Sequence, residues 1–337
     1  WRWAADGAWS PQEEERMRLA DQIIALRRKP DKIHKYFVPF AEAVAQAVPF
    51  EISDDVGRIA SAIKQSDARK LLAIHEHCRL PFERTWVEWQ GPSTEFGGSD
   101  RAEAVDSRAP RPDRCGALFE SLTDDNSAAQ ITMAWSHKAT GVNVSPIAIL
   151  IDWGGGGLPT DDLLKPSDPN ELRKWFPQYK NDNDDDLRAI DRRATVTLNP
   201  HMRGWWDAVK ARLPNVSDQK MVYDECLRDI KGEGGFCDGL IAAISARNLT
   251  AASAPEDVTF VNKTRRKLGR PPLLSFRTVR LSLSRTVERR RSEGQGNPMP
   301  LHMVRGHFKV RKSGIYWWAP FWRGDAAAGV VSRKGYE

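Results

Sequence analysis

The sequence predicts an α+β fold: an N-terminal helical layer, a central mostly antiparallel sheet, a second helical group and a C-terminal basic β-hairpin unit. Apolar residues recur at helical spacing through the first eighty residues. Runs of β-branched and aromatic residues, separated by Gly, Pro, Ser and Asp, follow, and helical spacing then returns. We therefore expect a helical region (1–80), an antiparallel sheet region (81–153), a helical region with an acidic turn (154–260) and a basic aromatic β-unit (261–337).

The first region contains three expected helices. Residues 10–13 (Ser-Pro-Gln-Glu) have the spacing of a capping box, with Pro11 at the first helical position. A helix from about 11 to 28 is predicted, and the same apolar spacing recurs at about 31–48 and 54–78. The run from His75 to Cys78 has residue types that bind metals, but His near a helix C-terminus also favours the helix dipole. We interpret it as the end of a helix.

Four strands are expected in the sheet region, at 85–89, 116–122, 129–135 and 144–153. Residues 91–113 are polar and rich in Gly, Pro and charge, which predicts a long excursion between strands. Helical spacing returns at 168–180, 205–213 and 220–248.

Two motifs in the third region suggest ligand sites. The four glycines at 154–157 are followed by no Gly-Lys-Ser/Thr, so we interpret them as a linker and not as a phosphate loop. The acidic run 181–186 has Leu187 where a calcium loop needs Gly and Arg193 where it needs Glu. A solvated acidic turn before a helix is the better interpretation, with a weak divalent-cation site as the alternative.

Charge is distributed unevenly along the chain. Residues 263–337 hold 18 Lys and Arg against 4 Asp and Glu, a net of +14, and the other residues hold 33 against 41, a net of −8, giving the total of +6. No apolar run approaches the roughly 20 residues that a membrane helix needs, so we expect no membrane contact. The four cysteines form no CxxC pair, which favours reduced thiols in the cytoplasm, and no cofactor or metal is predicted.

Near its start the basic unit contains residues 262–272, which predict a short basic helix that Gly and Pro stop. Its Gly-Arg-Pro sequence also resembles an AT-hook, a minor-groove motif that is easily matched by chance, and a helix stop is the preferred interpretation. Residues 276–283 then alternate as a strand, and a polar, arginine-containing stretch follows.

A β-hairpin is predicted from residue 301 to 323. Met303, Arg305, His307, Lys309 and Arg311 alternate with His302 and apolar residues, which in a strand puts cations on one face. The sequence Lys-Ser-Gly at 312–314 supplies the turn, and the return strand is rich in tryptophan. Cations neutralise phosphates while aromatic faces stack on bases, so this row predicts contact with DNA or RNA. The alternative partner is an acidic protein surface, including the acidic remainder of this chain.

A further pattern is formed by residues 80–82, 85–89, 262–263, 269–273, 302, 304–308, 314, 318, 320, 322–325, 329–330 and 336. Together these segments resemble a family of phage- and prophage-encoded proteins to which no activity is attached. The resemblance is good over the last 75 residues and patchy near 80–90; it implies a mobile-element origin and work inside a bacterial cell. The similar proteins often carry Arg or His where this chain has Ala319 and Phe321, which weakens any catalytic role for that strand.

Three functions follow from these observations. The first is a phage-encoded accessory protein that binds nucleic acid in the bacterial cytoplasm. The second is a nuclease-like enzyme in which His302 or His307 is the general acid or base beside Arg305. The third is a virion component, or an inhibitor that docks on a host protein. The candidate nucleic-acid-binding residues are Lys263, Arg265, Arg266, Lys267, Arg270, Arg305, His307, Lys309, Arg311, Trp317, Trp318, Trp322 and Arg323.

Overall fold

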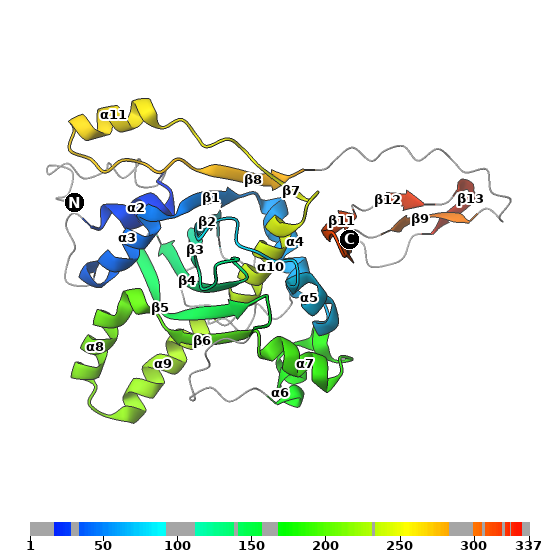
Figure 1. Ribbon diagram of the computed structural model, residues 1–337, viewed down its shortest axis with the longest axis horizontal. Coiled ribbons are helices and arrows are strands. Elements are labelled where there is room, and N and C mark those ends of the chain that lie inside the picture. The colour runs from blue at the N-terminus through cyan, green and yellow to red at the C-terminus, as the bar shows by residue number, and fades with distance from the viewer. Residues whose placement is uncertain are drawn as a thin grey trace.

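An eight-stranded sheet forms the centre of the molecule, with the strand order β6-β5-β4-β3-β2-β1-β8-β7 (Figure 1). The computed structural model describes residues 17–27, 34–91, 112–137, 141–156, 168–230, 233–282, 299–304, 307–318, 321–323 and 325–331. The strands of this sheet are β1 (Val48–Ile52), β2 (Arg84–Gln90), β3 (Arg114–Ser121), β4 (Ala128–His137), β5 (Gly141–Asp152), β6 (Ala194–Leu198), β7 (Thr250–Ala252) and β8 (Arg277–Leu281).

The predicted α+β class is confirmed. The four strands expected between residues 81 and 153 are β2 to β5, each antiparallel to the next. β8 was also expected, whereas β1, β6 and β7 were not. β1 lies between β2 and β8 and is parallel to both, so the sheet is mixed at this point. All four regions of the sequence contribute strands to this one sheet.

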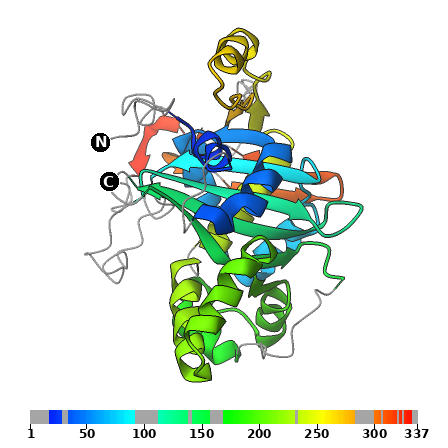
Figure 2. The same cartoon turned by 90° about the vertical axis from the view of Figure 1, so that its left-hand side faces the viewer.

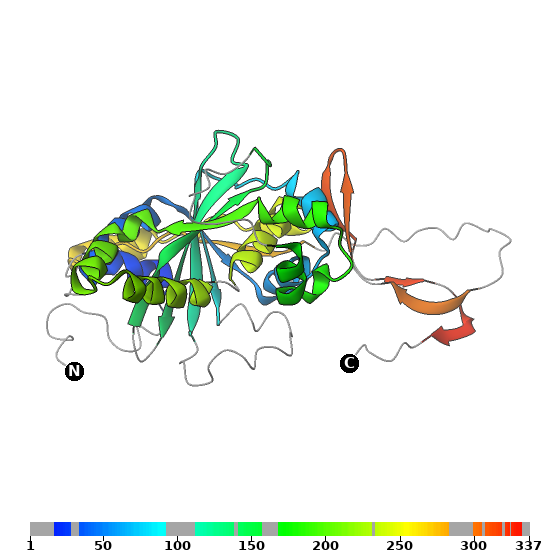
Figure 3. The same ribbon diagram turned by 90° about the horizontal axis from the view of Figure 1, so that it is seen from below.

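Helices cover both faces of the sheet (Figures 1 and 3). Side chains of α4, α5 and α10 pack with Val87 and Trp89 of β2 on one face, and those of α2 and α3 pack with Trp86 on the other. Three-ten turns are η2 (His34–Phe37), η5 (Pro177–Tyr179) and η6 (Pro200–Met202). The helices are α2 (Leu19–Ala25), α3 (Val38–Gln46), α4 (Asp54–Lys64), α5 (Ala68–His75), α6 (Pro169–Trp175), α7 (Asp184–Asp191), α8 (Arg203–Arg212), α9 (Val216–Ile230), α10 (Glu233–Ser245) and α11 (Thr259–Lys267).

Two of the predicted helices are divided in the structure. The segment 54–78 forms α4 and α5, because Asp67 accepts a hydrogen bond from Lys70 N and starts a new helix. The segment 220–248 forms parts of α9 and α10. The segment 31–48 contributes η2 and α3 and ends in β1, and the residues expected at the start of the first helix lie outside the described residues, as do residues 92–111.

Close packing joins α10 to α4. A Cβ atom on Gly239 would lie 2.1 Å from the backbone oxygen of Ala60, so glycine is required where these helices touch. The acidic run leads into a helix, as predicted, but its last three aspartates lie within the first turn of α7 and not in a turn before it; Asn183 accepts a hydrogen bond from Asp186 N and caps the helix. Of the four glycines, the described ones follow β5 and open no helix, in agreement with the linker interpretation.

The C-terminal region adds β10 (His307–Arg311) and β11 (Gly314–Trp318), and a three-stranded sheet of β12 (Phe321–Arg323), β9 (Pro300–Val304) and β13 (Asp325–Val331). The predicted hairpin is present, because β12 pairs with β9 in the same register in which β11 pairs with β10. Figure 3 shows the three-stranded sheet at the end of the molecule, beyond the β10–β11 hairpin. None of the helices in the described residues has both the length and the apolar character needed to cross a bilayer.

Candidate nucleic-acid interface

The β10–β11 hairpin has one apolar face and one cationic face. Phe308 and Ile315 are buried and belong to the main core. His307, Lys309 and Arg311, one position out of phase with Phe308, are exposed. The alternation predicted from the sequence is therefore found within β10.

Hydrogen bonds fix the apolar face on the end of α10. The Asn248 side chain accepts a hydrogen bond from Trp317 N at 2.8 Å and donates one to Trp317 O at 2.9 Å. Arg247 N also donates to Ile315 O at 3.1 Å. Trp317 packs against Phe308 with ring centroids 4.8 Å apart. The sequence predicted that Trp317 contacts nucleic acid. Its ring instead packs on the apolar face of the hairpin that contacts the core, which corrects this prediction.

On the outer face, each cation lies close to an aromatic ring. Lys309 Nζ is 4.6 Å from the centre of the Trp318 ring, and Arg311 Cζ is 5.6 Å from that of Tyr316. The His307 and Trp318 rings are 5.8 Å apart. Among the described residues, neither Lys309 nor Arg311 forms an ion pair with a carboxylate. The rings hold the cations in a row while their charge remains unneutralised by this part of the chain.

The second cationic group lies on α11, where Lys263, Arg266 and Lys267 are exposed. Arg265 was also predicted to bind nucleic acid, but only 7% of it is exposed, and its Nε donates to Pro271 O at 2.7 Å. Together with hydrogen bonds between Asn262 and Leu273, this contact closes the loop after α11. Arg265 is therefore a structural residue, which corrects the prediction.

The loop after α11 explains the Gly-Arg-Pro sequence. α11 ends at Lys267, and Gly269 has a positive φ of 67°, which ends the helix as predicted. Arg270 is half-buried and its backbone N–H donates to Arg265 O.

The structure does not bring the two cationic groups together. Figure 1 places α11 at the left of the molecule and β11 to the right of β7, with the length of β8 between them. Figure 2 shows α11 projecting from the β7–β8 edge of the sheet. Arg323 is exposed on β12. Arg305 lies outside the described residues, as do the side chains of His302 and Trp322, so the predicted acid–base pair of His302 or His307 with Arg305 is not described.

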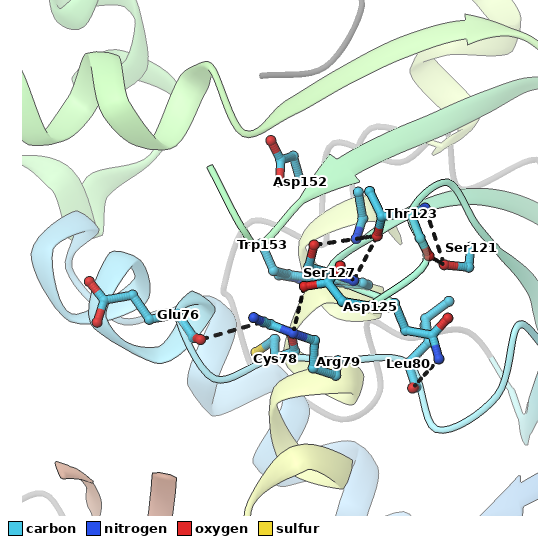
Figure 4. A network of polar contacts seen from close by, with 12 residues as sticks. Glu76, Cys78, Arg79, Leu80, Ser121, Thr123, Asp125, Ser127, Asp152 and Trp153 are labelled. Carbon is cyan, nitrogen blue, oxygen red and sulfur yellow. Dashed lines mark hydrogen bonds and ion pairs between the residues drawn. The ribbon is translucent and has the colours of Figure 1, made fainter. Parts of the chain in front are cut away.

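Sequence reasoning missed three residues that extend the cationic face. Tyr316 lies beside Arg311, a position that strand alternation in the return strand would have given. Arg247 and Arg79 line a pocket at the turn of the hairpin and come from segments distant in sequence. Figure 4 shows Arg79 beside Asp125, with Nε to Oδ2 at 3.5 Å, and its guanidinium also donates to Cys78 O at 2.6 Å.

Other arginines take part in a buried ionic network on the face of the sheet opposite to the one that the hairpin contacts. Glu88 is fully buried, and its carboxylate accepts hydrogen bonds from Arg114 Nη1 at 2.8 Å, Trp86 Nε1 at 3.0 Å and Ala20 N at 3.1 Å. Burial raises the pKa of Glu88 to about 7, against the effect of the Arg114 charge. The network anchors α2 to the sheet.

Arg18 extends this network to the surface. Its guanidinium contacts Glu51 at 3.0 Å and Glu256 at 2.6 Å and lies 4.2 Å from the centre of the Phe276 ring. Nearby, burial raises the pKa of Asp21 to about 6, although its carboxylate accepts a hydrogen bond from Leu274 N. Arg18 and Asp21 therefore already have partners within the chain.

Two histidine–carboxylate pairs were also not predicted. His75 Nε2 lies 2.7 Å from Asp238, which also accepts a hydrogen bond from Trp153 Nε1. α5 ends at His75, so the helix-end interpretation of the segment from His75 to Cys78 is confirmed. His201 Nε2 lies 2.5 Å from Glu120. No group of three His, Cys, Asp or Glu side chains in the described residues is placed to hold a metal ion.

Comparisons with models of protein families, with curated proteins and with solved structures found no match to this chain. The assignment of function therefore depends on the geometry of the chain itself.

Proposed function

We propose that this protein binds DNA or RNA through the cationic face of the β10–β11 hairpin. One observation carries the proposal: Lys309 and Arg311 are exposed, ordered by aromatic rings and without a carboxylate partner among the described residues. A phosphate backbone is a regular array of negative charge, and Lys and Arg that neutralise it release counterions and gain affinity.

The arrangement of the rings favours phosphate contacts over base stacking. One cation lies over each of Trp318 and Tyr316, so the covered face of each ring is occupied. The rings order the Lys309 and Arg311 side chains, which reduces the entropy lost when they bind an anion. Binding with little sequence preference follows from this arrangement.

The competing partner is the acidic remainder of this chain, and in the described residues its carboxylates form no ion pair with Lys309 or Arg311. The hairpin docks by its apolar face, through Phe308 and Ile315, and presents the cations away from the core. This orientation supports an external partner. The acidic charges of Glu51, Glu88 and Glu256 already have arginine partners on the other side of the sheet.

The test is a salt titration of binding to single-stranded and duplex oligonucleotides of DNA and RNA. For the wild-type protein, the logarithm of the affinity should fall linearly with the logarithm of the salt concentration. Lys309→Gln with Arg311→Gln should reduce that slope by about 0.7 to 0.9 for each lost phosphate contact. Arg212→Gln, which removes an exposed arginine at the end of α8, is the matched control. Binding that does not depend on salt would contradict the proposal.

The proposal also includes the cell compartment in which the protein binds nucleic acid. The resemblance of the last 75 residues to phage- and prophage-encoded proteins supports a role in the cytoplasm of a bacterial host, as an accessory protein of replication, transcription control or takeover of host machinery. Capture from lysate with and without nuclease treatment tests it: partners held through nucleic acid should be lost after digestion.

A second function, docking on another protein, is favoured by α11. Phe260 is 80% exposed and Leu268 is 62% exposed, and Lys263 and Lys267 lie on the same short helix. Exposed apolar side chains of this size are typical of interaction surfaces. Phe260→Ala should then remove captured proteins that resist nuclease and leave oligonucleotide binding unchanged. Loss of oligonucleotide binding in this variant would assign α11 to the first function instead.

A further inference from the structure

A pocket of about 370 Å³ lies at the turn of the β10–β11 hairpin. Three segments form it: the loop after α5, the end of α10 and the hairpin turn. Its polar lining consists of two arginines, two serines and a histidine, namely Arg79, Arg247, Ser245, Ser313 and His77. Among the described residues, no ionisable carboxylate belongs to this lining.

The pocket continues the cationic face of the hairpin. Tyr316 hydrogen-bonds with Ser313 Oγ at 3.1 Å, and the hydrogen bond, with the positive charges of Arg247 and Arg311, lowers the pKa of the phenol. Tyr316 thus lies between Arg247 of the pocket and Arg311 of the row. Among the described residues Arg247 is exposed and forms no ion pair with a carboxylate.

The walls of the pocket are fixed by backbone contacts. Ser245 Oγ accepts a hydrogen bond from Arg79 N and donates one to Arg79 O, both at 3.2 Å. Leu80 and Asn126 exchange two more, at 3.0 and 3.3 Å (Figure 4 shows the loop). A Cβ atom on Gly314 would lie 3.1 Å from Arg247 Nε, so glycine leaves the room that this guanidinium occupies. A preorganised site loses less entropy on binding.

We propose that this pocket binds a phosphate group of the nucleic-acid strand that lies along the hairpin. The inference rests on the proposed function and names the site that fixes the strand at the turn. A guanidinium binds phosphate through two parallel N–H···O hydrogen bonds, and the Ser313 hydroxyl can add a donor when it accepts its bond from Tyr316. Arg247, which forms no ion pair with a carboxylate among the described residues, supplies the main charge. Arg79 adds positive charge, although its Nε lies 3.5 Å from Asp125 Oδ2 and its Nη1 donates to Cys78 O.

The first experiment compares Arg247→Gln, Arg247→Lys and the control Arg212→Gln in the full chain. Arg247→Gln should weaken oligonucleotide binding at least about tenfold, the size expected of a charge-assisted hydrogen bond, and lower the salt slope by about 0.7 to 0.9. Arg247→Lys should restore the slope but not the full affinity, because lysine keeps the charge and lacks the paired donors. The control should match the wild type.

A second experiment tests the pocket without nucleic acid. Inorganic phosphate is titrated into the intact protein while the Nε–H resonances of its arginines are followed by NMR. The resonance of Arg247, assigned by its loss in Arg247→Gln, should shift with phosphate, and that of Arg212 should not. Oligonucleotides with and without a 5′-phosphate then distinguish a terminal from an internal group: a preference for the phosphorylated end indicates a terminal phosphate, and equal binding indicates the backbone.

The outcomes separate this inference from the function on which it rests. If the wild type binds oligonucleotides and Arg247→Gln changes neither affinity nor salt slope, the pocket proposal is overturned and the proposed function remains. If the wild type binds no oligonucleotide, the proposed function is overturned, and an unmoved Arg247 resonance in phosphate overturns the pocket as well. A phosphate shift in that case supports a site for a free phosphate group.

Discussion

Arg114 and Arg311 both lie on β-strands, but among the described residues only Arg114 is paired with carboxylates. Arg114 contacts the fully buried Glu88 at 2.8 Å and Glu51 at 3.4 Å, so its charge is neutralised inside the fold. Arg311 is exposed beside Tyr316 without a carboxylate among the described residues. A count of basic residues therefore overstates the charge available to a partner, because some arginines are structural.

The largest effect should come from breaking the buried pair. Arg114→Met leaves the Glu88 carboxylate buried without its cation and should lower the free energy of unfolding by about 3–5 kcal/mol at pH 8. Urea denaturation measures the change, with Arg212→Gln as the exposed control. A loss below about 0.5 kcal/mol, the range of ordinary surface substitutions, would show that Arg114 is no more structural than Arg311.

Removing the apolar contact of the hairpin should have the next largest effect. Ile315 is fully buried, and Ile315→Ala should lower the free energy of unfolding by about 2–5 kcal/mol because it leaves a cavity under β11. Oligonucleotide affinity should fall with it, since the cationic row loses its support. Full stability together with full binding in this variant would mean that docking does not position the row.

The pH dependence of stability should also reveal the buried network. The pKa of Glu88 is about 7 in the fold against the usual 4.5, and that of Asp21 is about 6 against 3.8. Both groups hold a proton in the folded state that the unfolded chain releases, so stability should fall as pH rises from about 4.5 to 7. The expected size is about 1.4 kcal/mol per unit of pKa difference. Glu88→Gln should flatten this slope, and an unchanged slope would mean that Glu88 does not titrate in this range.

The smallest effect on stability should come from the row itself. Lys309→Gln and Arg311→Gln should each change the free energy of unfolding by less than about 0.5 kcal/mol, because neither cation has a carboxylate partner in the described residues. A destabilisation above about 2 kcal/mol in thermal or urea unfolding would mean that Lys309 and Arg311 are structural residues, as Arg114 is.

Short-range sequence patterns correctly predicted the features that depend on neighbouring residues, such as strand alternation and turns. Strand alternation placed Phe308 inward and Lys309 outward, and turn residues placed the hairpin, because a strand has a period of two whatever it packs on. The N-terminal helices and β2 to β5 followed from the same kind of signal. β1 was missed because its five residues contain Pro49 and follow a helical pattern, and only pairing with β2 and β8 makes them a strand.

The site could be predicted only in part. The outward row was found, but Arg265 and Trp317 were also included, because residue type alone does not show that Arg265 is buried or that Trp317 packs against Phe308. Arg79 and Arg247 were missed because their proximity depends on tertiary contacts. Each is an ordinary arginine in its own segment, and only the packing of the hairpin turn beside α10 brings them to one pocket.

The position of β1 in the sheet constrains the order in which the protein folds during synthesis. β1 ends at Ile52, and its partner β8 begins only at Arg277, so one edge of β1 stays without that partner while the intervening chain is translated. At about 5–20 residues per second this delay is on the order of tens of seconds. An open strand edge can pair with other chains, so we expect the nascent protein to be most prone to aggregation in this interval.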